Sequence, residues 1–328
     1  MAVALGLALF SGCGSPTQPS PPAPTISCPM PVTQQTQAGQ AIIVTYPAPL
    51  VSGGNQPVTT TCSPPSGSSF AVGTTVVTCT ALDALHRTAT CSLPVTVVNV
   101  PQITTTKFVA FGDSITFGAL SPCLQSALFY TPAGRLLDLQ LILASVDIAT
   151  SYPTVLQTAL AKRYGAQSPR VLNEGQGGEF VTDSRTATRF LQVLNDDAPE
   201  VVLLQEGAND VNFGSLDTIP AIIDELRALV RTAKGRGLAV FLGTLTPERP
   251  GSCRGTNPTL IPPVNDQIRA MAAMEGVVLV DLYQTFDGRI ETLLGEDGLH
   301  PNVAGYEALA QTFFDSIRQQ LETPAAHP

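Results

Sequence analysis

Hydrophobic positions in the larger, C-terminal part of the chain come in short runs separated by helical patterns. Five of these runs have the length and residue types of buried strands: residues 108–111, 171–172, 201–204, 240–242 and 277–280. The clearest helical pattern lies at residues 220–234, where apolar side chains recur at i, i+3, i+4 and i+7. Strands that alternate with helices predict an α/β unit built on a parallel sheet, which we place at residues 104–323.

Residues 26–100 follow a different pattern, in which runs rich in Val and Thr alternate between apolar and polar positions. Turns rich in Gly and Pro separate the runs, which lie at residues 41–46, 58–62, 74–81 and 91–98. Alternation of this kind is typical of half-buried strands. The sequence therefore predicts a small all-β sandwich in front of the α/β unit.

The N-terminal segment, residues 1–13, has the pattern of an export signal. An apolar run ends in Phe10-Ser11-Gly12-Cys13, and a Pro-, Ser- and Thr-rich linker follows at residues 14–25. The Ser-Gly-Cys step resembles a bacterial lipoprotein signal, which implies lipidation of Cys13 and a membrane tether. An ordinary secretory signal is the alternative, and both place the protein outside the cytoplasm. Residues 324–328 are predicted to be a short tail.

The seven cysteines agree with export, since disulfides persist in oxidising compartments. With Cys13 set aside, four cysteines fall in the predicted β unit and two in the α/β unit, which suggests pairing within each unit. The four are Cys28, Cys62, Cys79 and Cys91, and their spacing leaves all three arrangements open. The other two, Cys123 and Cys253, are candidates for a bridge between two loops.

Charge and motifs exclude several classes of function. The formal net charge is −9, whereas nucleic-acid binding requires clustered Lys and Arg, so we expect no nucleic-acid partner. No apolar stretch reaches the roughly 18 residues of a membrane-spanning helix. The phosphate-binding Gly-rich loop and the His-Glu-x-x-His and Cys-x-x-Cys metal motifs are also missing, so the sequence implies no cofactor and no metal.

A candidate nucleophile follows the first predicted strand of the α/β unit, in Gly112-Asp113-Ser114. Ligands bind at the carboxyl edge of open parallel sheets, and a serine there needs a base to take its proton. Of the three histidines, only His300 lies inside the α/β unit, since His86 belongs to the β unit and His327 to the tail. Asp297, three residues before His300, completes a possible Ser-His-Asp triad.

Two further loops offer hydrogen-bond donors for the oxyanion of a tetrahedral intermediate. Residues 173–178 follow the second strand and residues 207–210 follow the third, so both are expected at the edge that carries Ser114. The first loop is rich in glycine, which permits close backbone approach.

These four blocks, in this order, resemble those of the SGNH (GDSL) hydrolases, over about residues 106–321. The resemblance implies a three-layer α/β/α flavodoxin-like fold, with Ser114 as nucleophile and Asp297 and His300 completing the triad. It also implies three oxyanion donors: the N–H of Ser114, the N–H of Gly178 and the side chain of Asn209. Ile115 stands where many members have Leu, and Gly175 and Gly177 compete with Gly178.

The β unit resembles a hyalin-repeat (HYR) module, an immunoglobulin-like spacing or adhesive unit without catalytic function. The resemblance is carried by Cys28-Pro29, by the turn at residues 62–67 and by residues 77–83 and 90–92.

Together these patterns predict an exported serine esterase that hydrolyses carboxylic esters through an acyl-enzyme. Family breadth favours short acyl or acetyl groups on a small molecule or an acetylated polysaccharide. A thioesterase or lysophospholipase is the alternative enzyme, and a surface adhesion lipoprotein with an inactive hydrolase domain is the alternative of another class. Residues 119–150 form an unusually long connection between the candidate nucleophile and the next predicted helix. We expect this connection either to line an acyl pocket or form a lid, or to add a helix over the sheet.

Overall fold

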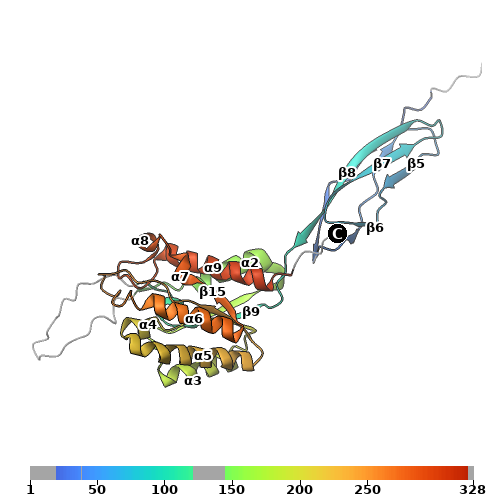
Figure 1. Cartoon of the computed structure of the whole chain (residues 1–328). Helices are drawn as coiled ribbons and strands as arrows, with labels where there is room; N and C mark the ends of the chain where they lie inside the picture. The colour runs from blue at the N-terminus through green and yellow to red at the C-terminus, as the bar shows by residue number, and fades with distance from the viewer. Residues whose placement is uncertain (1–19, 38, 121–144, 324–328) are drawn as a thin grey trace, which may run out of the picture. The chain divides into compact units, whose positions relative to one another are not determined.

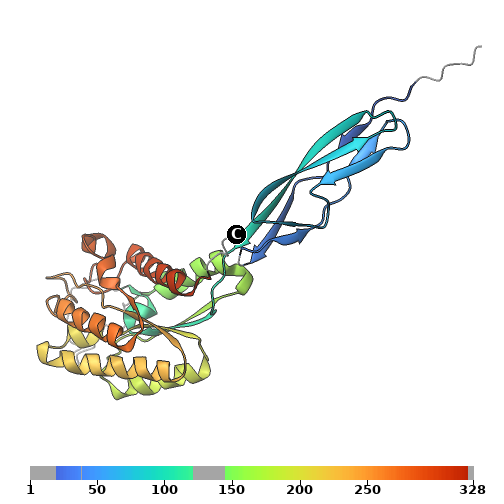
Figure 2. The ribbon, with the colours of Figure 1, turned by 45° about the vertical axis from the view of Figure 1, so that its right-hand side comes forward.

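The computed structural model describes residues 20–37, 39–120 and 145–323 of the chain, which divide into two compact units. The boundary between the units lies between Val100 and Pro101, and Figures 1 and 2 show each unit from two directions. The predicted export segment with Cys13, residues 121–144 with Cys123, and the tail lie outside the described residues. Among the described residues, no helix combines the length and apolar character needed to cross a bilayer.

The first unit is all-β, as predicted. A four-stranded sheet in the order β2-β8-β7-β5 is accompanied by the strand pairs β1-β4 and β3-β6. The strands are β1 Thr25–Ser27, β2 Val32–Gln37, β3 Ile42–Val44, β4 Leu50–Ser52, β5 Thr59–Ser63, β6 Ser68–Phe70, β7 Gly73–Leu82 and β8 Thr88–Val100. Alternate residues of β7 and β8 point inward and pack with Val44, Tyr46 and Phe70. The alternation of apolar and polar residues in the sequence thus arises because only one face of the sheet is buried.

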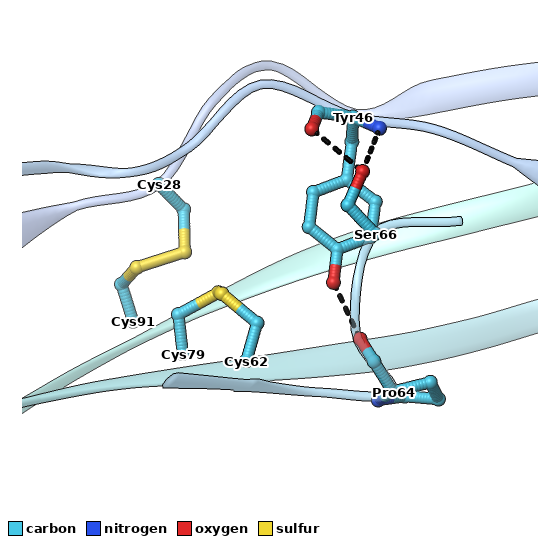
Figure 3. The surroundings of a disulfide bond; sticks show 7 residues. All are labelled: Cys28, Tyr46, Cys62, Pro64, Ser66, Cys79 and Cys91. Atoms are coloured by element: carbon cyan, nitrogen blue, oxygen red, sulfur yellow. Dashed lines mark hydrogen bonds between the residues drawn. A yellow bond between two sulfur atoms is a disulfide. The ribbon is translucent and has the colours of Figure 1, made fainter. Parts of the chain in front are cut away.

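Two disulfides pack with the core of this unit, Cys28–Cys91 and Cys62–Cys79 (Figure 3). Cys62 and Cys79 are directly opposite each other in the β5–β7 register. Beside them, the Tyr46 hydroxyl donates a hydrogen bond to the Pro64 carbonyl, and Ser66 bonds both backbone groups of Tyr46. The structure thereby selects one of the three pairings that the spacing left open.

The second unit contains a five-stranded parallel sheet in the order β12-β9-β13-β14-β15. Its strands are β9 Lys107–Gly112, β12 Arg170–Gly175, β13 Val201–Gln205, β14 Ala239–Gly243 and β15 Val278–Val280. When these five strands are numbered 1 to 5 along the chain, their order across the sheet is 2-1-3-4-5, which is the flavodoxin-like arrangement. Each of the five predicted apolar runs forms or overlaps one of these strands, and the expected fold class is confirmed.

Helices cover both faces of this sheet and make three layers (Figures 1 and 2). One core joins alternate strand residues, such as Phe111 and Leu204, to α3, α5 and α6. The other joins residues such as Phe108 and Leu203 to α2, α7, α8 and α9. The helices are α1 Ser114–Phe117, α2 Tyr152–Tyr164, α3 Ser184–Asp196, α4 Ala208–Asn212, α5 Ile219–Gly235, α6 Ile261–Glu275, α7 Leu282–Thr285, α8 Ile290–Leu293 and α9 Val303–Leu321. The helix predicted at residues 220–234 is α5.

Short elements complete the second unit. They are β10 Ala119–Leu120, which pairs antiparallel with β11 Ser145–Val146, and the 3₁₀ turns η2 Gly165–Gln167 and η3 Leu216–Thr218. The predicted connection at residues 119–150 therefore begins in β10 and returns through β11 and a turn to α2, while residues 121–144 lie outside the described residues.

Candidate active site

Ser114 begins the short helix α1, two residues after β9 ends at the carboxyl edge of the sheet. Asp113 caps this helix, because its Oδ1 accepts the N–H of Ile115 at 2.9 Å. Its Oδ2 accepts the N–H of Ala208 at 3.2 Å, which ties the start of α1 to the start of α4. Gly112 leaves no room for a side chain, since an added Cβ would lie 2.0 Å from the Gln205 carbonyl oxygen. The turn that presents Ser114 is thus held on two sides.

Ser114, His300 and Asp297 form one continuous chain of hydrogen bonds. The Oγ of Ser114 lies 2.8 Å from Nε2 of His300, and Nδ1 of His300 lies 2.6 Å from Oδ2 of Asp297. His300 and Asp297 are almost completely buried, while Ser114 keeps 9% of its surface exposed. The serine is therefore the member of the chain that is most accessible from solvent.

Asp297 is held as an acceptor by its surroundings. Its Oδ1 accepts the backbone N–H groups of Leu299 and His300, both at 3.0 Å. Burial by itself would raise the Asp297 pKa, but the hydrogen bonds from the His300 ring and from these N–H groups outweigh burial and lower it. An ionised Asp297 accepts the Nδ1–H of His300, which leaves the Nε2 lone pair directed at Ser114.

The loop that carries Asp297 packs against the segment after β14. The N–H of Arg249 donates to the Gly298 carbonyl at 2.7 Å, and the N–H of Arg254 donates to the Asp297 carbonyl at 2.9 Å. Gly298 has φ +76°, and a Cβ there would lie 1.7 Å from Ser252 Oγ. Both conformation and space thus require glycine one residue after the aspartate. Cys253, in the same segment, is disulfide-bonded, whereas its predicted partner Cys123 lies outside the described residues.

The glycine-rich loop after β12 offers two backbone donors that are not engaged elsewhere among the described residues. The Gly175 N–H already donates to Asn173 Oδ1 at 3.0 Å, and the Gln176 N–H to the Gly112 carbonyl at 2.8 Å. Gly178 has φ +76° with open space around its Cβ position. The remaining candidates for an oxyanion donor in this loop are therefore Gly177 and Gly178.

Asn209 lies in α4 and joins this loop to the one after β13. Its side-chain Nδ2 donates to the Glu179 carbonyl at 2.8 Å, and a second hydrogen on the same nitrogen is left for another acceptor. The next residue, Asp210, accepts the N–H groups of Val181 and Thr182 at 2.8 and 3.1 Å. Both residues thus fix the loop that contains Gly178.

Buried acids lie directly beneath the site. Burial raises the pKa of Asp113 to about 6, and burial together with the nearby Asp113 raises the pKa of Glu206 well above its usual range. Glu206 Oε2 has no hydrogen-bond partner among the described residues. Burial and the negative charge of Asp113 thus both favour the protonated form of Glu206.

The structure brings together Ser114, His300 and Asp297, and it places the loops of Gly178 and Asn209 next to each other. Cys13 is the one predicted site residue outside the described range. Three further residues support the site without having been given a role from the sequence: Asp113, which was noted only as part of the Gly-Asp-Ser motif, and Glu179 and Arg189, which form an ion pair. Asp113 carries a recognisable signal, an Asp directly before a short helix, whereas nothing in the spacing pairs Glu179 with Arg189. No group of His, Cys, Asp and Glu side chains in the described part of the chain is arranged to hold a metal ion.

Comparisons with known proteins agree on the family of the second unit. Residues 110–308 match the family model of the GDSL-like lipases/acylhydrolases, and residues 20–97 match that of the HYR domain.

Among curated proteins, a multidomain esterase of Ruminococcus flavefaciens is 27% identical over 179 residues, which are 54% of this chain and 21% of that protein. Esterase TesA of Pseudomonas aeruginosa is 25% identical over 178 residues, which are 54% of this chain and 82% of that protein. The chain thus spans about a fifth of the first relative and most of the second. A solved lipase/acylhydrolase from Enterococcus faecalis is 24% identical with a TM-score of 0.48, and the match covers 68% of this chain and 100% of that one.

Proposed function

The chain belongs to the GDSL-like lipase/acylhydrolase family, and we propose that it is an exported serine esterase that hydrolyses carboxylic esters. The observation that carries the proposal is the hydrogen-bonded chain from Ser114 Oγ through the His300 ring to Asp297. Two relatives are named esterases, which supports the same class of reaction.

In this mechanism His300 Nε2 takes the Ser114 proton as Oγ attacks the ester carbonyl carbon. The resulting oxyanion accepts hydrogen bonds from the N–H groups of Ser114 and Gly178 and from Asn209 Nδ2. His300 then protonates the leaving alcohol, and an acyl-enzyme remains on Ser114. Water, deprotonated by His300, releases the acid, and Asp297 keeps the ring in the tautomer that both steps need.

The proposed substrates carry short acyl or acetyl groups, on a small molecule or an acetylated polysaccharide. The test is a panel of p-nitrophenyl acetate, butyrate and octanoate, extended to an acyl-CoA and a lysophospholipid, with the full chain and its Ser114→Ala variant. We expect acetate to be the best substrate and the variant to lose on the order of 10⁴-fold or more in kcat. Retained activity in the variant would remove Ser114 from its role, whereas a preference for acyl-CoA or lysolipid would move the protein to the alternative enzyme class.

Export is the second part of the proposal. Two disulfides in the first unit support an oxidising compartment, and we propose that residues 1–13 direct export, that residues 26–100 act as a spacer and that residues 104–323 carry the activity. Fractionation of cells that express the wild type and Cys13→Ala, with palmitate labelling, tests the tether. Labelling of the wild type alone supports lipidation, and labelling of neither leaves an ordinary secretory signal.

A further inference from the structure

The three proposed oxyanion donors come from three different loops, after β9, β12 and β13. Each donor must lie within a few tenths of an ångström of its place, because pre-organised donors stabilise the transition state only when they need not move. The loops therefore require a connection that fixes their relative positions. One side chain from outside the three loops, Arg189 in α3, contacts two of them directly and the third through Glu179.

Arg189 reaches both ends of the loop that contains Gly178. Its Nη1 donates to the Glu174 carbonyl at 2.8 Å, before the loop, and its Nε donates to Glu179 Oε1 at 2.8 Å, after it. Nη2 forms a second bond to the Glu179 carboxylate, which makes the ion pair bidentate. These bonds therefore fix the distance between Glu174 and Glu179, the two ends of the loop that contains Gly178.

The same guanidinium extends to the strand that leads to the nucleophile. Nη2 lies 3.4 Å from the Gly112 carbonyl, two residues before Ser114, and the guanidinium carbon lies 3.9 Å from the centre of the Phe111 ring. The Gly112 carbonyl also accepts the N–H of Gln176. Arg189 thus links the end of β9 to the glycine-rich loop.

Glu179 carries the connection to the third donor. Its carboxylate binds Arg189, while its backbone carbonyl accepts Nδ2 of Asn209 at 2.8 Å. That bond determines the rotation of the Asn209 amide and hence the direction of its second hydrogen. Movement of Glu179 would therefore displace Asn209 and Gly178 together.

We propose that the Arg189–Glu179 ion pair is the positioning element of the oxyanion hole, which sets the places of the Ser114, Gly178 and Asn209 donors at once. The proposal rests on the proposed esterase function. Neither residue contacts the reacting atoms in this scheme, so both are positioning residues. Lysine cannot replace the arginine, because a single ammonium does not span two carbonyls and a bidentate carboxylate.

The test uses the full chain with Arg189→Lys, Arg189→Gln and Glu179→Gln, each also combined with Asn209→Ala. Arg269→Gln is the matched control, because Arg269 forms a comparable ion pair with Asp281 in the same unit, without a contact to the three loops among the described residues. Measurements are kcat and KM for p-nitrophenyl acetate and the melting temperature of every variant.

We expect Arg189→Gln and Arg189→Lys to lower kcat about 10- to 100-fold with KM changed less than about threefold, since misplaced donors weaken transition-state binding alone. Glu179→Gln, which keeps the carbonyl that receives Asn209, should lose less. In the Asn209→Ala background the Arg189 substitutions should cost much less than in the wild type, because one of the donors that they displace is already gone. Arg269→Gln should keep kcat.

The proposal would be overturned if the Arg189 substitutions lowered kcat by the same factor in the wild type and in the Asn209→Ala background. It would also be overturned if they lowered kcat no more than Arg269→Gln does. If Arg189→Gln does not fold, Glu179→Gln decides by the same comparison. Failure of the esterase function itself is recognised separately, because the wild type would then not hydrolyse p-nitrophenyl acetate, and a wrong nucleophile is recognised because Ser114→Ala would then keep the activity of the wild type.

Discussion

Replacing Asp297 with asparagine should stop catalysis while the fold is kept. In the wild type, Oδ1 accepts two backbone N–H groups, from Leu299 and His300, so the asparagine oxygen is expected to keep this side and its NH₂ group to face His300 Nδ1. The Oδ2 atom that it replaces lies 2.6 Å from Nδ1, too close for two donors. The ring must then carry its proton on Nε2, where it cannot accept the proton of Ser114. Loss of this tautomer costs on the order of 10⁴-fold in kcat in the Ser-His-Asp triad.

The assay is steady-state hydrolysis of p-nitrophenyl acetate by Asp297→Asn, with thermal unfolding measured on the same samples. Asp281→Asn is the control, because Asp281 also follows a strand and caps a short helix, α7, but contacts neither Ser114 nor His300. We expect kcat of the control to stay within about threefold of the wild type. A loss of less than about tenfold in Asp297→Asn, at an unchanged melting temperature, would refute the assignment of Asp297 as the residue that orients His300.

Three further predictions concern structure around the site and in the first unit. Gly298→Ala should unfold at a lower temperature and lose activity, because the new Cβ meets Ser252 Oγ at a positive φ; a fully active, equally stable variant would contradict this. Burial raises the pKa of Glu248 from 4.5 to about 7. Because the folded protein then holds this proton more tightly than the unfolded chain, the free energy of unfolding of the wild type should fall by on the order of 3 kcal/mol as the pH rises from about 4.5 to 7. Glu248→Gln should not show this fall. Parallel curves of unfolding free energy against pH for the two proteins, measured by urea unfolding, would refute the prediction. Replacing Cys28 and Cys91 with alanine should destabilise the first unit by about 4 kcal/mol, from a closed loop of 63 residues, and leave kcat unchanged, as calorimetry and the ester assay would show.

Strands and helices followed from the sequence where one residue pattern decides the element. The run at residues 201–204 is apolar at every position because β13 lies in the middle of the sheet with helices on both faces, and α5 follows its apolar stripe to within one residue at each end. The strand order and the cysteine pairing depend on contacts between distant residues, which periodicity does not encode. The Cys62–Cys79 pair became visible only once β5 and β7 were in register.

At the candidate site, the sequence predicted residue types better than their partners. Only one histidine lies in the α/β unit, so scarcity singled out His300 before any distance was known. Arg189 has no such signal, because it lies mid-helix, ten residues after Glu179, in a chain where most charged residues are solvated. The role of Arg189 depends on the path of the loop between Glu179 and α3. That path is determined by tertiary hydrogen bonds, such as those from Arg189 to the Glu174 and Gly112 carbonyls, rather than by composition.

The topology of the sheet explains why a short motif such as Gly-Asp-Ser has meaning in this chain. Strands β9 and β13 are neighbours at the centre of the sheet, but the chain leaves β9 toward β12 on one side and leaves β13 toward β14 on the other. Loops that diverge in this way leave a crevice at the carboxyl edge, where ligands bind in doubly wound folds. Ser114 and Asn209 stand at the starts of those two loops. The order of the blocks along the chain therefore carries more information than the letters of any one block, because that order places Ser114 and Asn209 on the two strands where the connections diverge.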